Sequence, residues 1–309
     1  MRQNETTAFV IPCLNEELTI AQVIRDCRMH LPQASVYVFD NNSTDKTAEV
    51  ARAEGATVIA SPKPGKGSVI QHAFQILDAD HLVILDGDAT YPVHKAPEMV
   101  SLLNSKRYDM VVCTREAANN KKAFPKFHKL GNRGFSMLVS GLLGNSVSDV
   151  FSGYRAVSRD FYESLTLESR GFEIESELTI KAYSHGFSVK EVQGPYHERP
   201  EGSHSKLKTF SDGSRILKFV FLVMRDCRPL FFFGWIAILC FLLSLAAGWA
   251  PIQYYIHFFF FYTVPRAVLS ASLMILSIVS FGVGLILDSQ LRHLRDQSKL
   301  MRRWLKRRT

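Results

Sequence analysis

The chain has 309 residues, 47% of them apolar, and a formal net charge of +8, which is enough for one domain of ordinary size and a further segment. Almost all of that charge lies in residues 292–309, directly after a long uncharged stretch. This position argues against nucleic-acid binding and favours contact with anionic lipid headgroups.

The N-terminal part alternates between strand and helix patterns. Runs of β-branched residues predict strands at 8–12, 35–40, 56–60 and 81–86, and helical patterns predict helices at 16–31, 43–55 and 66–77. Such alternation is typical of an α/β fold with right-handed βαβ units and a mostly parallel sheet.

Polar residues follow three of these predicted strands. They are Asn15 and Glu16, then Asp40 to Asn42, then Asp86 to Asp88. Ligands of open α/β sheets bind at the carboxyl ends of the strands. We therefore expect the three clusters to line one crevice.

Asp86 and Asp88 are separated by a single glycine. Two carboxylates this close repel each other unless a cation neutralises them. Oxygen ligands favour Mg²⁺ or Mn²⁺, which is commonly shared with substrate phosphates. We interpret the pair as metal ligands; the alternative is a solvated turn, because Asp-Gly is common in turns.

The sequence "GKGS" at 65–68 superficially matches a phosphate-binding P-loop. The first glycine of that motif would fall at Ala60, and Gly67 stands where the motif requires Ser or Thr. We therefore do not interpret it as a P-loop.

The C-terminal part predicts two membrane spans. Residues 229–265 and 267–287 contain no Asp, Glu, Lys or Arg, and about 20 apolar residues are enough for one span. We expect spans at about 229–251 and 264–287, a transmembrane hairpin within 229–288, and a basic tail at 289–309. The alternative is a pair of buried helices in a soluble core.

Two spans return the chain to its starting side, and basic residues favour the cytoplasmic side. We therefore expect a multi-pass membrane protein whose N-terminal domain and termini are all cytoplasmic. Residues 211–228 place apolar side chains on one face and cationic side chains beside it. This pattern favours an amphipathic interfacial helix over an ordinary domain helix.

Seven motifs together resemble the family 2 glycosyltransferases of the GT-A fold, in particular the polyprenyl-phosphate or dolichyl-phosphate sugar synthases. The motifs are "VIPCLNEE" (10–17), "VFDNNSTDKT" (38–47), "GKGSVIQHAF" (65–74), "LDGDATYP" (85–92), "SDVFSGYRAVSR" (148–159), "GFEIESEL" (171–178) and "RPEGSHSKLKTFSDGSRIL" (199–217). The resemblance implies a Rossmann-like GT-A domain at 1–210.

The resemblance also implies an activity: inverting transfer of a sugar from a nucleotide-sugar to polyprenyl phosphate, with Mg²⁺ or Mn²⁺ as cofactor. By analogy with bacterial relatives, it favours UDP over GDP, a UDP-hexose or UDP-N-acetylhexosamine donor, and the bacterial inner membrane as location. It implies a homo-oligomer as well. The motifs do not specify the sugar or the polyprenol length.

The resemblance assigns the nucleotide-sugar site to matching positions. They are Pro12, Leu14, Asn15, Glu16, Asp40, Asn42, Lys66 and Asp86, with Asp86 and Asp88 at the metal. Two positions depart from the family. Leu14 stands where many relatives have a Tyr that stacks on the base, and Thr90 stands where several relatives have a Gln that ligates the metal.

A lipid phosphate is largely anionic at neutral pH, because its second pKa is about 6, so it attacks without a dedicated base. The protein must instead position two anions, a task that suits arginine. The acceptor-phosphate candidates are Arg115, Arg133, Arg155, Ser205 and Lys206, and the catalytic candidates are Asp88, Asp149 and Arg155.

Several of these assignments have alternatives. Each arginine is also consistent with a surface ion pair. Asp149 is consistent with orienting the sugar, orienting Arg155 or acting as a base, and we favour orientation. Glu175 and Glu177 are consistent with an ordinary helix face. At the level of function, the alternatives are a membrane-anchored glycosyltransferase with another lipid, glycan or protein acceptor, and a catalytically silent scaffold.

Overall fold

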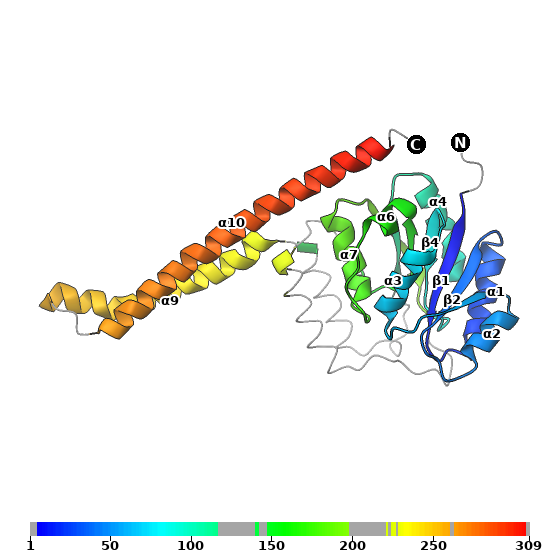
Figure 1. The fold of residues 1–309 in the computed structure, drawn as a ribbon, viewed down its shortest axis with the longest axis horizontal. Helices are drawn as coiled ribbons and strands as arrows, with labels where there is room; N and C mark the ends of the chain where they lie inside the picture. Colours follow the sequence, from blue (N-terminus) through cyan, green and yellow to red (C-terminus); the bar gives the residue numbers. More distant parts are fainter. Residues whose placement is uncertain are drawn as a thin grey trace. The chain divides into compact units, whose positions relative to one another are not determined.

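The computed structural model describes residues 5–116, 140–141, 147–197, 221, 224–226, 228–259 and 263–306. Contacts divide the chain into two units, Met1–Thr209 and Phe210–Thr309 (Figure 1). Each unit is described by itself below. The predicted interfacial helix at 211–228 lies mostly outside the described residues, and residues 221 and 224–226 within it are helical.

The first unit is built on a seven-stranded sheet with the order β3-β2-β1-β4-β6-β5-β7. The strands are β1 (Thr7–Cys13), β2 (Ser35–Asp40), β3 (Thr57–Ala60), β4 (His81–Ile84), β5 (Met110–Glu116), β6 (Arg155–Ser158) and β7 (Val189–Pro195). Pairing is parallel except at β6, which runs antiparallel to both β4 and β5. The predicted mostly parallel, Rossmann-like sheet is thus confirmed.

Helices cover both faces of the sheet. They are α1 (Ile20–His30), α2 (Thr47–Ala53), α3 (Lys66–Ile76), the short 3-10 helix η1 (Val93–Lys95), α4 (Ala96–Asn104), α6 (Arg159–Ser164) and α7 (Ile174–Ser184). One buried apolar cluster joins the sheet to α1, α2 and α4, and a second joins it to α3, α6 and α7. Both faces are covered, as alternating βα units require.

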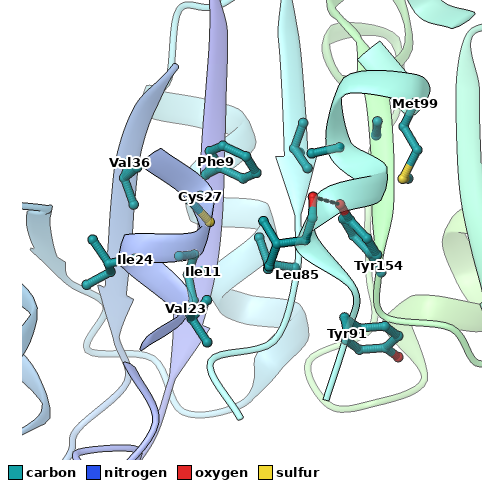
Figure 2. Close-up of a cluster of buried hydrophobic side chains, with 14 of the residues drawn as sticks. Phe9, Ile11, Val23, Ile24, Cys27, Val36, Leu85, Tyr91, Met99 and Tyr154 are labelled. Carbon is teal, nitrogen blue, oxygen red and sulfur yellow. Dashed lines mark hydrogen bonds between the residues drawn. The ribbon is translucent and has the colours of Figure 1, made fainter. Parts of the chain in front are cut away.

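The first cluster shows why these segments pack as they do (Figure 2). Phe9 and Ile11 point from β1 toward the apolar stripe of α1, which includes Val23, Ile24 and Cys27. Side chains on one face of a strand recur every two residues, and those on one face of a helix recur every three to four. The apolar residues of β1 and α1 follow these spacings, so each element has one apolar face toward the other. The cluster extends across the sheet to Tyr154, whose hydroxyl donates to the Val93 carbonyl at 3.3 Å.

Two predicted helices begin later than expected. The helix predicted at 16–31 begins at Ile20, and the helix predicted at 43–55 begins at Thr47. The residues before each helix form hydrogen-bonded turns that connect it to the preceding strand. These turns therefore lie at the carboxyl ends of β1 and β2.

The second unit contains α9 (Pro229–Phe258) and α10 (Val264–Lys306). Both helices are long and apolar enough to cross a membrane. Both also exceed the predicted spans, because α9 continues through Pro251 to Phe258 and α10 continues through most of the basic tail. At about 1.5 Å per residue, α10 is roughly 65 Å long, twice the thickness of a hydrocarbon core of about 30 Å.

Small polar residues join α9 to α10. Ser244 donates its hydroxyl to the Ser270 carbonyl at 2.8 Å, and Ser270 donates in return to the Ser244 carbonyl at 2.8 Å. Ser277 donates to the Ala237 carbonyl, also at 2.8 Å. Gly248 faces Ser270 so closely that an added Cβ would lie 2.6 Å from its hydroxyl oxygen. This close packing is typical of membrane helices.

Candidate active site

Polar loops at the carboxyl ends of β1, β2 and β4 form the candidate site. Because β2 and β4 both pair in parallel with β1, their ends lie at one edge of the sheet. Each loop contains a non-glycine residue in the left-handed region: Asn15 at φ 51°, Asn42 at φ 65° and Ala89 at φ 57°. Such conformations cost energy and concentrate at functional sites.

Asn15 and Glu16 tie the β1 loop to the β2 loop. The side-chain oxygen of Asn15 accepts from the Thr44 backbone N–H at 2.7 Å, and the Asn15 N–H donates to the Ser43 hydroxyl at 3.0 Å. The N–H of Glu16 donates to the Thr47 hydroxyl at 2.8 Å. These bonds fix the loop shape around Leu14, which is partly exposed, and Pro12, which is half-buried.

Asp40 ends β2 beside these loops. Its buried Oδ1 atom accepts no hydrogen bond within the part of the chain that the structure describes. A buried carboxylate oxygen normally has a donor, so this atom fits a donor supplied by a ligand. Asn42, two residues later, donates its amide to the Pro62 carbonyl at 3.2 Å.

Asn41 is a site residue that the sequence did not single out. Its amide donates to the carbonyls of Ser61 and Lys63, both at 2.8 Å, and its side-chain oxygen accepts from the Gly65 N–H at 2.8 Å. The residue therefore connects β2 to the segment that precedes α3. The only local signal was its place in the run Asn41-Asn42 after a strand.

Lys66 forms the centre of a buried charge cluster. Its ammonium contacts Oδ1 of Asp86 and lies 2.6 Å from Oε1 of Glu175. Burial disfavours the charged form of Lys66, but the two carboxylates outweigh this effect and raise its pKa. Burial also raises the pKa of Glu175, because one ammonium shared with Asp86 does not fully compensate it.

Glu175 and Glu177 have different environments although they lie on the same helix. Residues two apart on a helix point in different directions. Glu177 lies 2.7 Å from the Lys181 ammonium and accepts from the backbone N–H groups of Glu168 and Ser169, at 2.9 and 2.8 Å. Only Glu175 therefore belongs to the Lys66 cluster.

Asp88 is buried and held by Thr90. The Thr90 hydroxyl donates to Oδ1 of Asp88 at 2.6 Å, and the Thr90 N–H donates to the same oxygen at 3.2 Å. Thr90 itself is fully buried. Its side chain therefore orients a predicted metal ligand.

Asp86 and Asp88 fit a divalent cation that is shared with a substrate. Among the described residues, no group of three or more His, Cys, Asp and Glu side chains is arranged to hold a metal by itself. Mg²⁺ is usually bound through one or two carboxylates together with phosphates and water. Two oxygen-donating side chains at a strand end match that pattern.

Arg115 and Asp149 form a bidentate ion pair. Nε and Nη2 of Arg115 donate to the two carboxylate oxygens of Asp149, both at 2.8 Å. Burial disfavours the charged guanidinium, but the hydrogen bonds to Asp149 outweigh it and raise the pKa of Arg115. The guanidinium carbon also lies 5.6 Å from the ring centroid of Tyr196. Asp149 thus orients an arginine, as favoured, but the arginine is Arg115 rather than Arg155.

Arg155 lies in a different environment from the one expected for a phosphate ligand. It is 1% exposed, and its guanidinium donates to the carbonyls of Ser152 and Val150, both at 2.9 Å. This placement favours a role in ordering residues 149–153. Arg133, Ser205 and Lys206 lie outside the described residues.

The N-terminus of α3 is not open to a phosphate. The N–H groups of Gly67 and Ser68 donate to the Arg170 carbonyl, at 2.9 and 3.3 Å. The sequence "GKGS" therefore serves close packing between α3 and the segment before α7, consistent with the rejection of a P-loop.

Comparisons with known proteins agree with this geometry. The family model described as glycosyl transferase family 2 matches residues 8–166. A dolichyl-phosphate hexose transferase of Haloferax volcanii is 32% identical over 222 residues, which cover 72% of this chain and 95% of that protein. Glycosyltransferase AglJ of the same organism is 34% identical over 231 residues, 74% of this chain and 76% of the relative.

A solved structure shares the fold. Glucosyl-3-phosphoglycerate synthase from Mycobacterium tuberculosis, crystallised with Mn²⁺ and UDP-glucose, has a TM-score of 0.60 at 24% identity, over 72% of this chain and 79% of that chain. At this identity the likeness establishes the GT-A fold alone. Together with the family model and the curated relatives, it leads to one conclusion: the chain is a glycosyltransferase and belongs to glycosyl transferase family 2.

Proposed function

We propose that the protein transfers a sugar, with inversion, from a nucleotide-sugar to polyprenyl phosphate. The observation that carries this proposal is the combination of the Asp86–Asp88 pair and the Arg115–Asp149 pair in a family 2 fold, on a chain with two apolar C-terminal helices. The likeness to a dolichyl-phosphate hexose transferase supports a lipid phosphate as acceptor. A UDP-hexose or UDP-N-acetylhexosamine is our proposed donor.

In this proposal the loops after β1 and β2 bind the nucleotide. The buried Oδ1 atom of Asp40, which accepts no hydrogen bond from the described residues, is suited to accept from a base N–H group. Leu14 offers an apolar surface beside it, with less stacking area than an aromatic ring. Pro12, Asn15, Glu16 and Asn42 shape this pocket.

Asp86 and Asp88 would hold Mg²⁺ or Mn²⁺, which on binding would neutralise the departing diphosphate. Thr90 keeps Asp88 in a fixed orientation toward that position. The hydrogen bonds to Asp149 raise the pKa of Arg115 and hold its guanidinium in place, and a preorganised cation of this kind reduces repulsion between two anionic reactants. The acceptor phosphate attacks without a general base, since it is already ionised. Arg133, Ser205 and Lys206 stay proposed acceptor ligands.

We also propose that α9 and α10 anchor the protein in the plasma membrane, with the first unit and both termini in the cytoplasm. The cationic residues after the apolar part of α10 support this orientation. A membrane anchor places the enzyme on the same surface as its lipid acceptor. The same anchor also suits an enzyme with a different lipid, glycan or protein acceptor.

The test uses membranes that contain the overproduced protein, Mn²⁺, polyprenyl phosphate and labelled UDP- and GDP-sugars. We expect metal-dependent label in the organic phase that mild acid releases, and no such label with Asp88→Asn. The donor that gives the label identifies the sugar. Label that appears only in a glycan or protein fraction would contradict the proposed acceptor.

A further inference from the structure

Lys66 has two carboxylate partners, and only one of them is a predicted metal ligand. Asp86 belongs to the metal pair, whereas Glu175 comes from α7 and lies 2.6 Å from the ammonium. The side chains of Lys66 and Glu175 are nearly buried, at 7% and 11% exposure, and that of Asp86 is 26% exposed. One ammonium therefore forms ion pairs with two carboxylates, and Asp86 is the more exposed of the two.

The three charged groups are held by close backbone packing. A Cβ added at Gly153 would lie 2.7 Å from the Lys66 ammonium, 2.8 Å from Asp86 and 3.0 Å from Glu175. A Cβ added at Gly67 would lie 2.1 Å from the Ser169 carbonyl oxygen. Only glycine fits at either position without displacement, so the chain leaves little free volume around the ammonium.

The elements that carry Lys66 and Glu175 are also joined directly. The Gly67 N–H donates to the Arg170 carbonyl at 2.9 Å, and the Gln71 amide donates to the Ser169 carbonyl at 2.9 Å. The backbone positions of Lys66 and Glu175 are therefore fixed relative to each other.

A divalent cation on Asp86 would repel the adjacent ammonium of Lys66. Two positive charges that both contact Asp86 repel each other strongly when they are shielded from water. The Lys66 ammonium is nearly buried and already contacts a second carboxylate, Glu175. Glu175 can hold the ammonium while Asp86 turns its charge toward the metal.

We propose that Glu175 is a positioning residue that retains Lys66 when the metal and diphosphate occupy Asp86. The ammonium neutralises Asp86 in the metal-free protein and shifts to Glu175 when the metal binds. The inference rests on the proposed function, because it requires a divalent cation at Asp86 and Asp88. It assigns to Glu175 a role in metal affinity without direct contact with the metal.

The proposal predicts how the charges compete. In Glu175→Gln, Lys66 keeps only Asp86 as a carboxylate partner and opposes the metal, so the Mn²⁺ dissociation constant should rise about tenfold, within the usual range of coupling between two binding events. In the double variant Lys66→Met/Glu175→Gln the competing ammonium is gone. Its Mn²⁺ dissociation constant should return to the wild-type value or fall below it.

The experiment measures free Mn²⁺ by electron paramagnetic resonance, with the full-length protein in nanodiscs and saturating UDP. Wild type, Glu175→Gln and the double variant form the test series. Glu177→Gln is the matched control, because Glu177 is also a buried carboxylate on α7 paired with a lysine. We expect Glu177→Gln to lower the melting temperature but not to change the Mn²⁺ dissociation constant.

The outcomes separate the two proposals. Wild-type protein that binds no Mn²⁺ in the presence of UDP would contradict the metal site and this inference together. Wild-type binding with an unchanged constant in Glu175→Gln would overturn the inference alone. If Glu175→Gln does not fold, the double variant decides: wild-type or tighter binding supports the proposal, and binding weakened about tenfold contradicts it.

Discussion

At the scale of single residues, Thr90 has a clear part in the site. Its hydroxyl donates to Asp88, a proposed metal ligand, at 2.6 Å. A hydrogen bond to a charged group is worth about 1.5–3 kcal/mol. Thr90 thus contributes through the orientation of Asp88.

Replacing Thr90 by Ala should lower kcat/KM by about 10- to 100-fold, which corresponds to the loss of that bond. Thr90→Ser keeps the hydroxyl and should retain most of the activity. Steady-state kinetics with the donor that the labelling experiment identifies measures both variants. Equal losses in the two variants would show that the methyl group, and not the hydroxyl, is what matters.

Arg115 depends on the geometry of its guanidinium as well as on its charge. Both donors that face Asp149 are used, at 2.8 Å each, and a lysine offers no such fork. We expect Arg115→Lys to lower kcat by about 10- to 100-fold, in the range of losing one hydrogen bond to a charged group. Asp149→Asn should give a similar loss, because the arginine loses its orienting partner. An Arg115→Lys variant with wild-type kcat would contradict this role.

The lowered pKa of Glu177 predicts how the stability of the protein changes with pH. Burial opposes its ionisation, but bonds from Lys181, Ser169 and Glu168 outweigh that effect and lower its pKa. Because the folded-state pKa is depressed, its stabilising contribution is present above the unfolded value of about 4.3 and is lost as the pH falls through the folded value.

The melting temperature of full-length protein in detergent tests this sign. The difference between wild type and Glu177→Gln should be largest at about pH 6 and should shrink at about pH 3.5, below the unfolded pKa. Wild-type protein therefore loses more stability on acidification than the variant does. A difference in melting temperature that widens at low pH would contradict a lowered pKa for Glu177.

At the scale of elements, the contact between α9 and α10 depends on small residues. An added Cβ at Gly248 would lie 2.6 Å from the Ser270 hydroxyl oxygen, which bonds to the Ser244 carbonyl. A Cβ added at Gly282, in α10, would meet nothing within 4 Å among the described residues. The two glycines therefore form a matched pair.

Gly248→Ala should weaken the helix pair by about 0.6–1.7 kcal/mol, the usual range for a polar contact between membrane helices. Gly282→Ala should leave stability unchanged or raise it slightly, because alanine favours a helix. Denaturation in detergent micelles, followed by circular dichroism, compares the two variants. An effect of the same size in both would show that the Ser244–Ser270 contact is not the cause.

The packing of α3 against the segment before α7 also depends on a small residue, Gly67. Lys66 and Glu175 meet although they are 109 positions apart in the sequence. The close approach of Gly67 to the Ser169 carbonyl, and the bond from its N–H to Arg170, make that meeting possible. The elements thus bring together charges that neither element specifies alone.

At the scale of the whole molecule, the chain combines a soluble-type α/β unit with two apolar helices. The exposed side chains of the second unit are largely apolar, including Trp235, Leu242 and Trp249. Such a surface is unfavourable in water and favourable in lipid. Membrane insertion accounts for it without another partner.

The proposed orientation predicts which end of the hairpin faces outward. Phe259, at the turn end of α9, is 82% exposed. A Phe259→Cys variant should react with a membrane-impermeant maleimide added to intact cells, whereas wild-type protein, the control for its own cysteines, should not. Labelling that requires cell lysis would contradict the proposed topology.

Much of this architecture is already determined by the sequence. Runs of β-branched residues locate the four N-terminal strands, and helical patterns locate the helices between them, because both kinds of pattern reflect which side chains are buried. The polar residues after β1, β2 and β4 identify the edge of the sheet where we propose that ligands bind. The lengths of the uncharged segments identify two helices that suit a bilayer, because its thickness sets their length.

Tertiary structure decided which charges meet. The antiparallel strand β6 lies between β4 and β5, so it places Gly153 against Lys66, Asp86 and Glu175. It also buries Arg155 and leaves Arg115 as the partner of Asp149. Local patterns carry no information on pairs so far apart in the chain, because their distances depend on strand order. The sequence therefore determined the location of the site, and only the packing of the sheet decided which cation serves which carboxylate.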